Sequence, residues 1–98
     1  MVDNFICWLN HNKKEFQKHG FVIFDTLFNE QEESSEGSVV VTTENDDYIC
    51  QFTIRNNGLT DIEVIDVKGG DLVFYIYCKS NMTLNFDNMF AMFFDFCQ

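Results

Sequence analysis

Hydrophobic residues follow a helical period at the start of this chain. Val2, Phe5, Leu9 and Phe16 recur at close to 3.6-residue spacing, whereas the nearby lysines fall on the opposite side. This spacing predicts an amphipathic helix with one apolar face. Gly20 follows the last periodic residue and suits the left-handed conformation in which helices often end.

The middle of the chain changes to the two-residue period of β-strands. Residues 21–28 are dense in β-forming residues, which predicts a strand covered on much of both faces. Residues 29–37 contain no apolar side chain and predict a solvated loop. Four further strands are expected, in residues 38–43, 48–55, around 61–64 and in 72–79, because turn-forming clusters separate them at 44–47, 56–58 and 68–70.

The last segment returns to helical spacing. Phe86, Met89, Phe90, Phe93 and Cys97 would share one face of a C-terminal helix, which can close the apolar face of the sheet. We therefore predict an α+β fold with an N-terminal helix, an antiparallel meander of about five strands and a C-terminal helix packed on one sheet face. A chain of 98 residues has room for a single domain, residues 1–98.

Alternation in the predicted sheet directs a mixed set of side chains away from the core. Tyrosine and arginine are frequent anchors of protein interfaces, and carboxylates complement a basic partner. Two interpretations stay open, since this surface is either a partner-binding patch or the ordinary polar side of a sheet whose tyrosines another element covers. The expected patch comprises Gln51, Thr53, Arg55, Asp61, Glu63, Tyr75 and Tyr77.

Net charge points to a basic partner independently of this patch. The chain has 16 acidic and 6 basic side chains, a formal net charge of -10, which exceeds the roughly 2 to 8 units that solubility requires. Such a surface repels nucleic acid and anionic lipid and steers basic proteins toward it. The candidate partner-binding residues are Glu30, Glu32, Glu33 and Glu36 in the loop, Asp46 and Asp47 in a turn, and Arg55, Asp61, Glu63, Tyr75 and Tyr77 on the sheet.

Catalytic and metal-binding patterns are hard to assemble. The two histidines, His11 and His19, belong to the first helix, away from the strands, and no nucleophile elbow or phosphate loop occurs. The carboxylate pairs of the turn and the outward face would have to converge and be partly buried to bind a metal or cleave a glycoside. We predict no enzymatic activity, no cofactor and no metal.

The cysteines and the N-terminal sequence bear on location. Cys7, Cys50, Cys78 and Cys97 are widely spaced and form no Cys-x-x-Cys pair, which predicts reduced, mostly buried thiols. The chain has no signal-peptide pattern and no apolar run near the roughly 20 residues of a membrane span. A cytoplasmic protein is the expectation.

Several segments together resemble the TriTu family of immunity proteins, which accompany polymorphic toxins in bacteria, including those of contact-dependent growth inhibition. Trp8-Leu9 in the first helix is similar to the Trp-Leu of the family, and where the family has Phe-Thr-Val-Trp this chain has Phe52-Thr53-Ile54-Arg55. The resemblance covers nearly the whole chain in order, through residues 38–41, 48–54, 57–66, 72–77 and 86–96. It implies a non-enzymatic inhibitor that binds one cognate toxin domain, expected to be a nuclease, and protects the producing cell.

The charge and the resemblance lead to one function hypothesis. Nucleases that act on RNA need cationic clefts, and a rigid acidic protein can occupy such a cleft. We expect a monomeric bacterial immunity protein that neutralises a basic nuclease toxin, specifically an RNase, one to one and without binding nucleic acid or membrane. The alternatives are a nucleic-acid mimic that blocks a host nuclease and a secretion chaperone, which needs a hydrophobic groove and favours a dimer.

Overall fold

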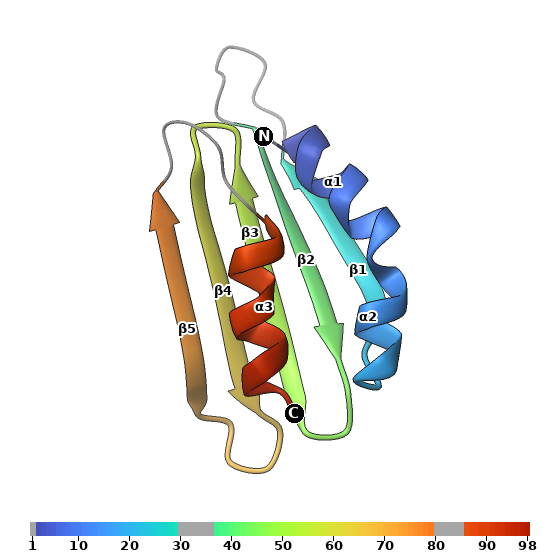
Figure 1. The fold of residues 1–98 in the computed structure, drawn as a ribbon. Coiled ribbons are helices and arrows are strands. Elements are labelled where there is room, and N and C mark those ends of the chain that lie inside the picture. Colours follow the sequence, from blue (N-terminus) through green and yellow to red (C-terminus); the bar gives the residue numbers. More distant parts are fainter. Residues whose placement is uncertain (1, 30–36, 80–85) are drawn as a thin grey trace.

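A computed structural model describes residues 2–29, 37–79 and 86–98 of the chain. The strands form one antiparallel sheet in the order β1-β2-β3-β4-β5, and the helices of the described ranges lie against one face of it (Figure 1). The predicted α+β fold is confirmed. Its elements are α1 (Val2–His11), α2 (Lys13–Lys18), β1 (Val22–Asn29), β2 (Ser38–Glu44), β3 (Tyr48–Arg55), β4 (Leu59–Asp66), β5 (Leu72–Lys79) and α3 (Phe86–Phe96).

The helical segment at the start of the chain consists of two helices rather than one. The break is at Asn12, whose side-chain amide donates a hydrogen bond to the Trp8 carbonyl oxygen at 2.8 Å. An asparagine side chain that bonds the backbone in this way competes with the helical ladder. Phe5 in α1 and Phe16 in α2 are nevertheless both fully buried, so the two helices share the predicted apolar face. Gly20 follows α2 with a φ of 78°, as predicted.

Phenylalanine rings fill the space between the helices and the sheet. Phe5, Phe16, Phe52, Phe90 and Phe93 are all completely buried. The ring of Phe52 on β3 meets the rings of Phe90 and Phe93 on α3 edge to face, with centroids 5.0 and 5.2 Å apart. Edge-to-face pairs at this separation add to the stabilisation from buried area. The C-terminal helix thus closes the apolar face of the sheet, as the sequence predicts.

The first strand was expected to be covered on both faces, and this expectation is wrong. β1 is an edge strand paired with β2, and Val22, Leu27 and Phe28 are all more than half exposed. A β-bulge interrupts its pairing between Ile23 and Asp25. An apolar run indicates a strand, but it does not tell a central strand from an edge strand, because neighbouring strands decide how much is covered.

The other edge strand, β5, is the least buried strand for which every residue is described. None of its residues is fully buried, whereas Thr60, Ile62 and Val64 on neighbouring β4 all are. The reason is visible in Figure 1, where α3 lies over β3 and β4 and β5 lies beyond it. The inward-facing side chains of β5 therefore remain partly accessible beside α3.

Candidate functional site

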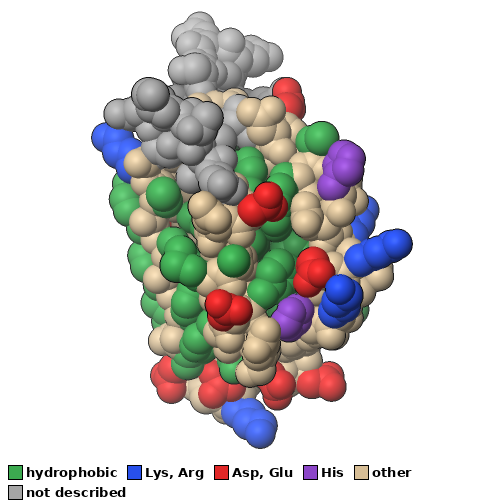
Figure 2. Space-filling view, in the orientation of Figure 1, with side chains coloured by type: hydrophobic (Ala, Val, Ile, Leu, Met, Phe, Trp, Pro, Cys, Tyr) green, Lys and Arg blue, Asp and Glu red, His purple; other side chains and the backbone are tan. Residues whose placement is uncertain are grey.

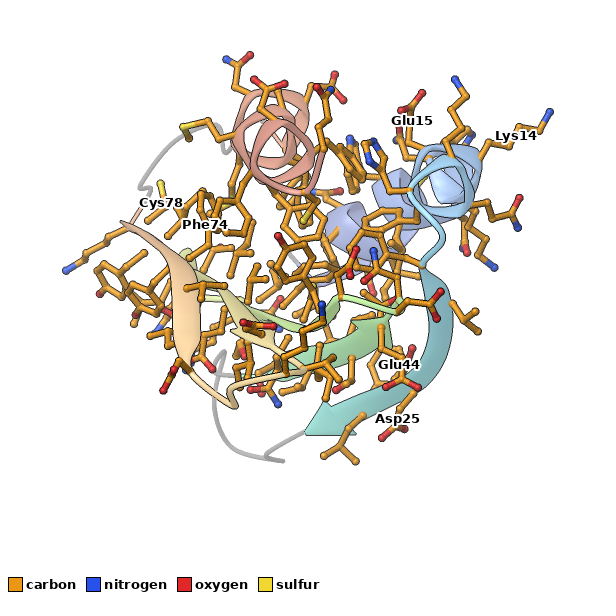
Figure 3. The ribbon with its side chains drawn as sticks, turned by 90° about the horizontal axis from the view of Figure 1, so that it is seen from below. Lys14, Glu15, Asp25, Glu44, Phe74 and Cys78 are labelled. Carbon is orange, nitrogen blue, oxygen red and sulfur yellow. The ribbon has the colours of Figure 1, made fainter. Side chains whose placement is uncertain are left out.

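The face of the sheet opposite the helices carries most of the predicted patch, and we call it the outer face. In Figure 3 the helices lie on one side of the sheet, and no helix of the described residues covers the other side. Strand register sets the side chains in rows. Thr53 is opposite Asp61, which is opposite Tyr77, and in the next row Glu63 is opposite Tyr75. The residues predicted to share this surface do share it.

A hydrogen-bonded network organises the centre of the outer face. Asp61 accepts a hydrogen bond from Arg55 Nη1 at its Oδ2 atom and another from the Tyr75 hydroxyl at Oδ1, at 3.0 and 2.9 Å. The Asp61 side chain is only 15% exposed. Its hydrogen bond with the Tyr75 hydroxyl raises the pKa of Tyr75, and the nearby Glu63 carboxylate contributes to the same shift. Arg55 therefore compensates the charge of Asp61, and the hydrogen bond from its hydroxyl holds the Tyr75 side chain in place.

Glu63 differs from Asp61 because its carboxylate has no cationic partner among the described residues. The two ion pairs in those ranges are Arg55 with Asp61 and Lys18 with Glu15. Glu63 is half-buried and lies in register with Tyr75 on β5. A carboxylate in this setting suits a charge-assisted hydrogen bond from a lysine or arginine of a binding partner.

Apolar side chains extend the outer face beyond the predicted residues. Leu27, Ile49 and Leu72 are exposed on β1, β3 and β5. Strict alternation with Tyr75 and Tyr77 would place Leu72 on the helix side. It pairs instead with Ile65, which belongs to the outer face, because the register shifts between Val64 and Ile65. A β-bulge of this kind reverses the alternation locally.

The remaining predicted acids lie elsewhere. Asp46 and Asp47 are exposed in the turn between β2 and β3, at one end of the sheet. The Asp47 carbonyl oxygen accepts a hydrogen bond from the Val67 backbone N–H at 3.0 Å, which joins this turn to the one between β4 and β5. Asp66 ends β4 just before that second turn, and Asp71 precedes β5. Figure 2 shows acidic side chains gathered at this end, called the acidic end below. The third predicted group, Glu30, Glu32, Glu33 and Glu36, lies outside the described residues.

The histidines and cysteines do not form a site together. The His19 ring stacks on Phe94 with centroids 5.0 Å apart, and His11 Nδ1 lies 2.7 Å from the Cys7 carbonyl oxygen. All four cysteines are free, as predicted, but the prediction that most of them are buried is wrong, because only Cys50 is buried, Cys78 and Cys97 are half-buried and Cys7 is exposed. A hydrogen bond with the Cys97 thiol, together with burial, raises the pKa of Cys50. Within the described ranges no three metal-ligating side chains gather in one group.

Comparison with known protein families assigns the chain to one of them. The family model described as "Immunity protein TriTu" matches residues 3–96. The chain belongs to this family. Its resemblance to TriTu proteins, noted from the sequence, is thereby confirmed across nearly the whole chain. No curated protein shows a significant match.

Membership in the TriTu family indicates the role of the protein. An immunity protein acts by binding a cognate toxin, so the family indicates a binding protein rather than an enzyme. Every outer-face residue named above lies within the segment that the TriTu model matches. None of the helices in the described ranges is long and apolar enough to span a membrane.

Proposed function

We propose that this TriTu protein neutralises a nuclease toxin, specifically an RNase, in the bacterial cytoplasm by occupying its cationic substrate cleft with the outer face. One copy binds one toxin domain. The observation that carries the proposal is the pair of carboxylates on this face: Asp61 is fixed by Arg55 and Tyr75, and Glu63 beside it has no cationic partner among the described residues. A rigid carboxylate array flanked by tyrosines matches the chemistry of a cleft that binds phosphates.

The distribution of charge supports this orientation. Residues 20–98 hold 14 acidic and 3 basic side chains, hence a formal charge of -11. Lys13, Lys14 and Lys18 are exposed on α2, on the helix side of the sheet. A cationic toxin is therefore repelled from α2 and attracted to the outer face and the acidic end, which steers the encounter.

The outer face and the acidic end have different roles in this proposal. Exposed turn carboxylates such as Asp46 and Asp47 add to the long-range field, whose effect is mainly on the association rate. Tyr75 and Tyr77 offer large, half-exposed ring surfaces that a partner can bury, and such contacts mainly set the dissociation rate. The outer face is the binding surface, and the acidic end assists the approach.

The test uses the toxin domain encoded beside this gene. An equimolar amount of the immunity protein should abolish RNA cleavage by that domain, and the association rate should fall steeply as salt rises while dissociation changes little. Unrelated ribonucleases are the control, since equal inhibition of these would identify a general nucleic-acid mimic instead. Salt-independent association, or a toxin domain that cleaves no nucleic acid, would contradict the proposal.

A further inference from the structure

The two edges of the sheet are built differently. β1 carries two features that protect an edge from pairing with another strand, a β-bulge between Ile23 and Asp25 and the exposed charge of Asp25 itself. β5 has neither in its central part. Its pairing with β4 is regular from Phe74 to Lys79, and no charged residue occurs before Lys79. In the described ranges β5 pairs with β4 alone, so alternate backbone groups of β5 point away from the sheet.

Both sides of β5 also have accessible side chains. Phe74, Ile76 and Cys78 are only partly buried on the helix side, and Figure 3 shows Phe74 and Cys78 there beside α3. Hydrophobic side chains are correspondingly visible along this margin of the molecule in Figure 2. On the outer face, Tyr75 and Tyr77 are 50% and 54% exposed. An added strand would meet an apolar surface on one side and an aromatic, acidic surface on the other.

We infer that β5 is the docking edge for an extended strand of the toxin, which adds to the sheet as a sixth strand. This inference rests on the proposed function and specifies the element and the mode of binding. The incoming strand alternates apolar side chains, packed beside Phe74 and Ile76, with lysine or arginine side chains on the outer face. Backbone hydrogen bonds along the edge supply affinity, and the alternating side chains supply specificity.

Charge complementarity identifies the occupant as a basic strand. Asp61 and Glu63 lie on β4, in register with Tyr77 and Tyr75. A strand added beside β5 would lie two strand spacings, about 10 Å, from β4. A lysine or arginine side chain on the added strand and the Glu63 side chain on β4 are together long enough to span this distance. A second copy of this chain would instead bring two molecules of net charge -10 edge to edge. Like charges so placed oppose pairing, so self-association through β5 is disfavoured.

Amide hydrogen exchange on the wild-type proteins tests the docking edge directly. Adding the neighbouring toxin domain should slow exchange of alternate β5 amides by about tenfold or more, with no change in β1. A complex that leaves β5 exchange unchanged, or that protects β1 instead, would overturn this inference alone. Absence of any complex would overturn the proposed function and this inference with it. A dimer of the free protein held together through β5 would show that the occupant is a second copy.

Proline substitutions supply a matched second test. Tyr75→Pro and Ile76→Pro remove adjacent backbone N–H groups, and the one that points away from β4 is expendable for folding. Circular dichroism identifies the folded variant. This variant should bind the toxin domain about tenfold more weakly than the alanine variant at the same position, since both lack the side chain and only proline lacks the N–H. Equal affinity of the proline and alanine variants would overturn the inference.

Discussion

The two faces of the sheet are made from alternate residues of the same strands, yet they have opposite properties. On the helix side, Phe52, Ile54 and Ile62 are fully buried, whereas their sequence neighbours Thr53 and Asp61 face the other way and remain accessible. Adjacent residues in a strand point to opposite faces. One face can therefore hold the fold together while the other changes to suit a partner. Substitutions on the two faces should have separable effects.

The largest expected effect is on the helix side. Phe52→Ala removes a buried ring that packs against Phe90 and Phe93, and should lower the free energy of unfolding by about 3 to 5 kcal/mol. Thr53→Ala, one residue away on the outer face, should change it by no more than about 0.5 kcal/mol. Urea denaturation measures both. Similar losses for the two variants would mean that the outer face is also part of the stabilising core.

A second comparison concerns binding. Tyr75→Ala should raise the dissociation rate of the toxin domain about 30-fold, equivalent to roughly 2 kcal/mol, because it removes the ring and releases Asp61 from one hydrogen bond. Tyr75→Phe keeps the ring and should have a smaller effect. Surface plasmon resonance measures both rates. Wild-type dissociation of the alanine variant would move the interface away from β5.

Two buried threonines on the helix side sharpen the account of the core. Thr43 Oγ1 donates a hydrogen bond to the Val22 carbonyl oxygen at 2.6 Å, whereas the buried Thr60 Oγ1 has no hydrogen-bond partner among the described residues. Thr60→Val should therefore stabilise the protein by about 1 kcal/mol and raise Tm by about 4 to 8 °C. Thr43→Val should destabilise it by a similar amount. Differential scanning calorimetry distinguishes them, and a lower Tm for Thr60→Val would reveal a partner for its hydroxyl.

The smallest effect expected is pH dependence on the outer face. The hydrogen bond to Asp61 raises the pKa of Tyr75 in the folded protein. The contribution of this hydrogen bond to stability is therefore complete below the ordinary tyrosine pKa of about 10, and it is lost as the pH rises through the raised pKa of Tyr75 in the folded protein. Denaturation of wild type and Tyr75→Phe at increasing alkaline pH should show the difference between them shrinking. A constant difference would mean that the hydroxyl does not interact with Asp61 in solution.

Local sequence patterns predict most of the fold, because the spacing of apolar residues indicates whether a segment is a strand or a helix and which of its faces is buried. Two-residue alternation correctly separates Cys50 and Phe52 from Gln51 and Thr53, and helical spacing identifies the buried face of α3. The failures depend on neighbours that a local pattern does not contain. The edge position of β1 follows from the order of strands, and the break between α1 and α2 follows from a side-chain hydrogen bond of Asn12.

Part of the candidate site could likewise be predicted from the sequence, and part could not. Alternation on β3, β4 and β5 predicts that Arg55, Asp61, Glu63, Tyr75 and Tyr77 share a surface, and they do. Asp61 and Glu63 have the same charge and lie on the same strand, but only Asp61 forms an ion pair with Arg55. This difference can be recognised only from atomic distances in the structure. The place of Leu72 on the outer face depends on a register shift between β4 and β5, which strict two-residue alternation does not predict.

The central claim is that the outer face contacts the toxin, and a pair of charge reversals tests it. Glu63→Lys on the outer face and Asp95→Lys on α3 change the net charge equally, so both should slow association to a similar extent. Only Glu63→Lys should also raise the dissociation rate, by about tenfold or more, because it places a cation against a cationic partner. The measurement is the dissociation rate of each variant from the neighbouring toxin domain. A selective increase for Glu63→Lys supports the account, and equal dissociation rates for the two variants would contradict it.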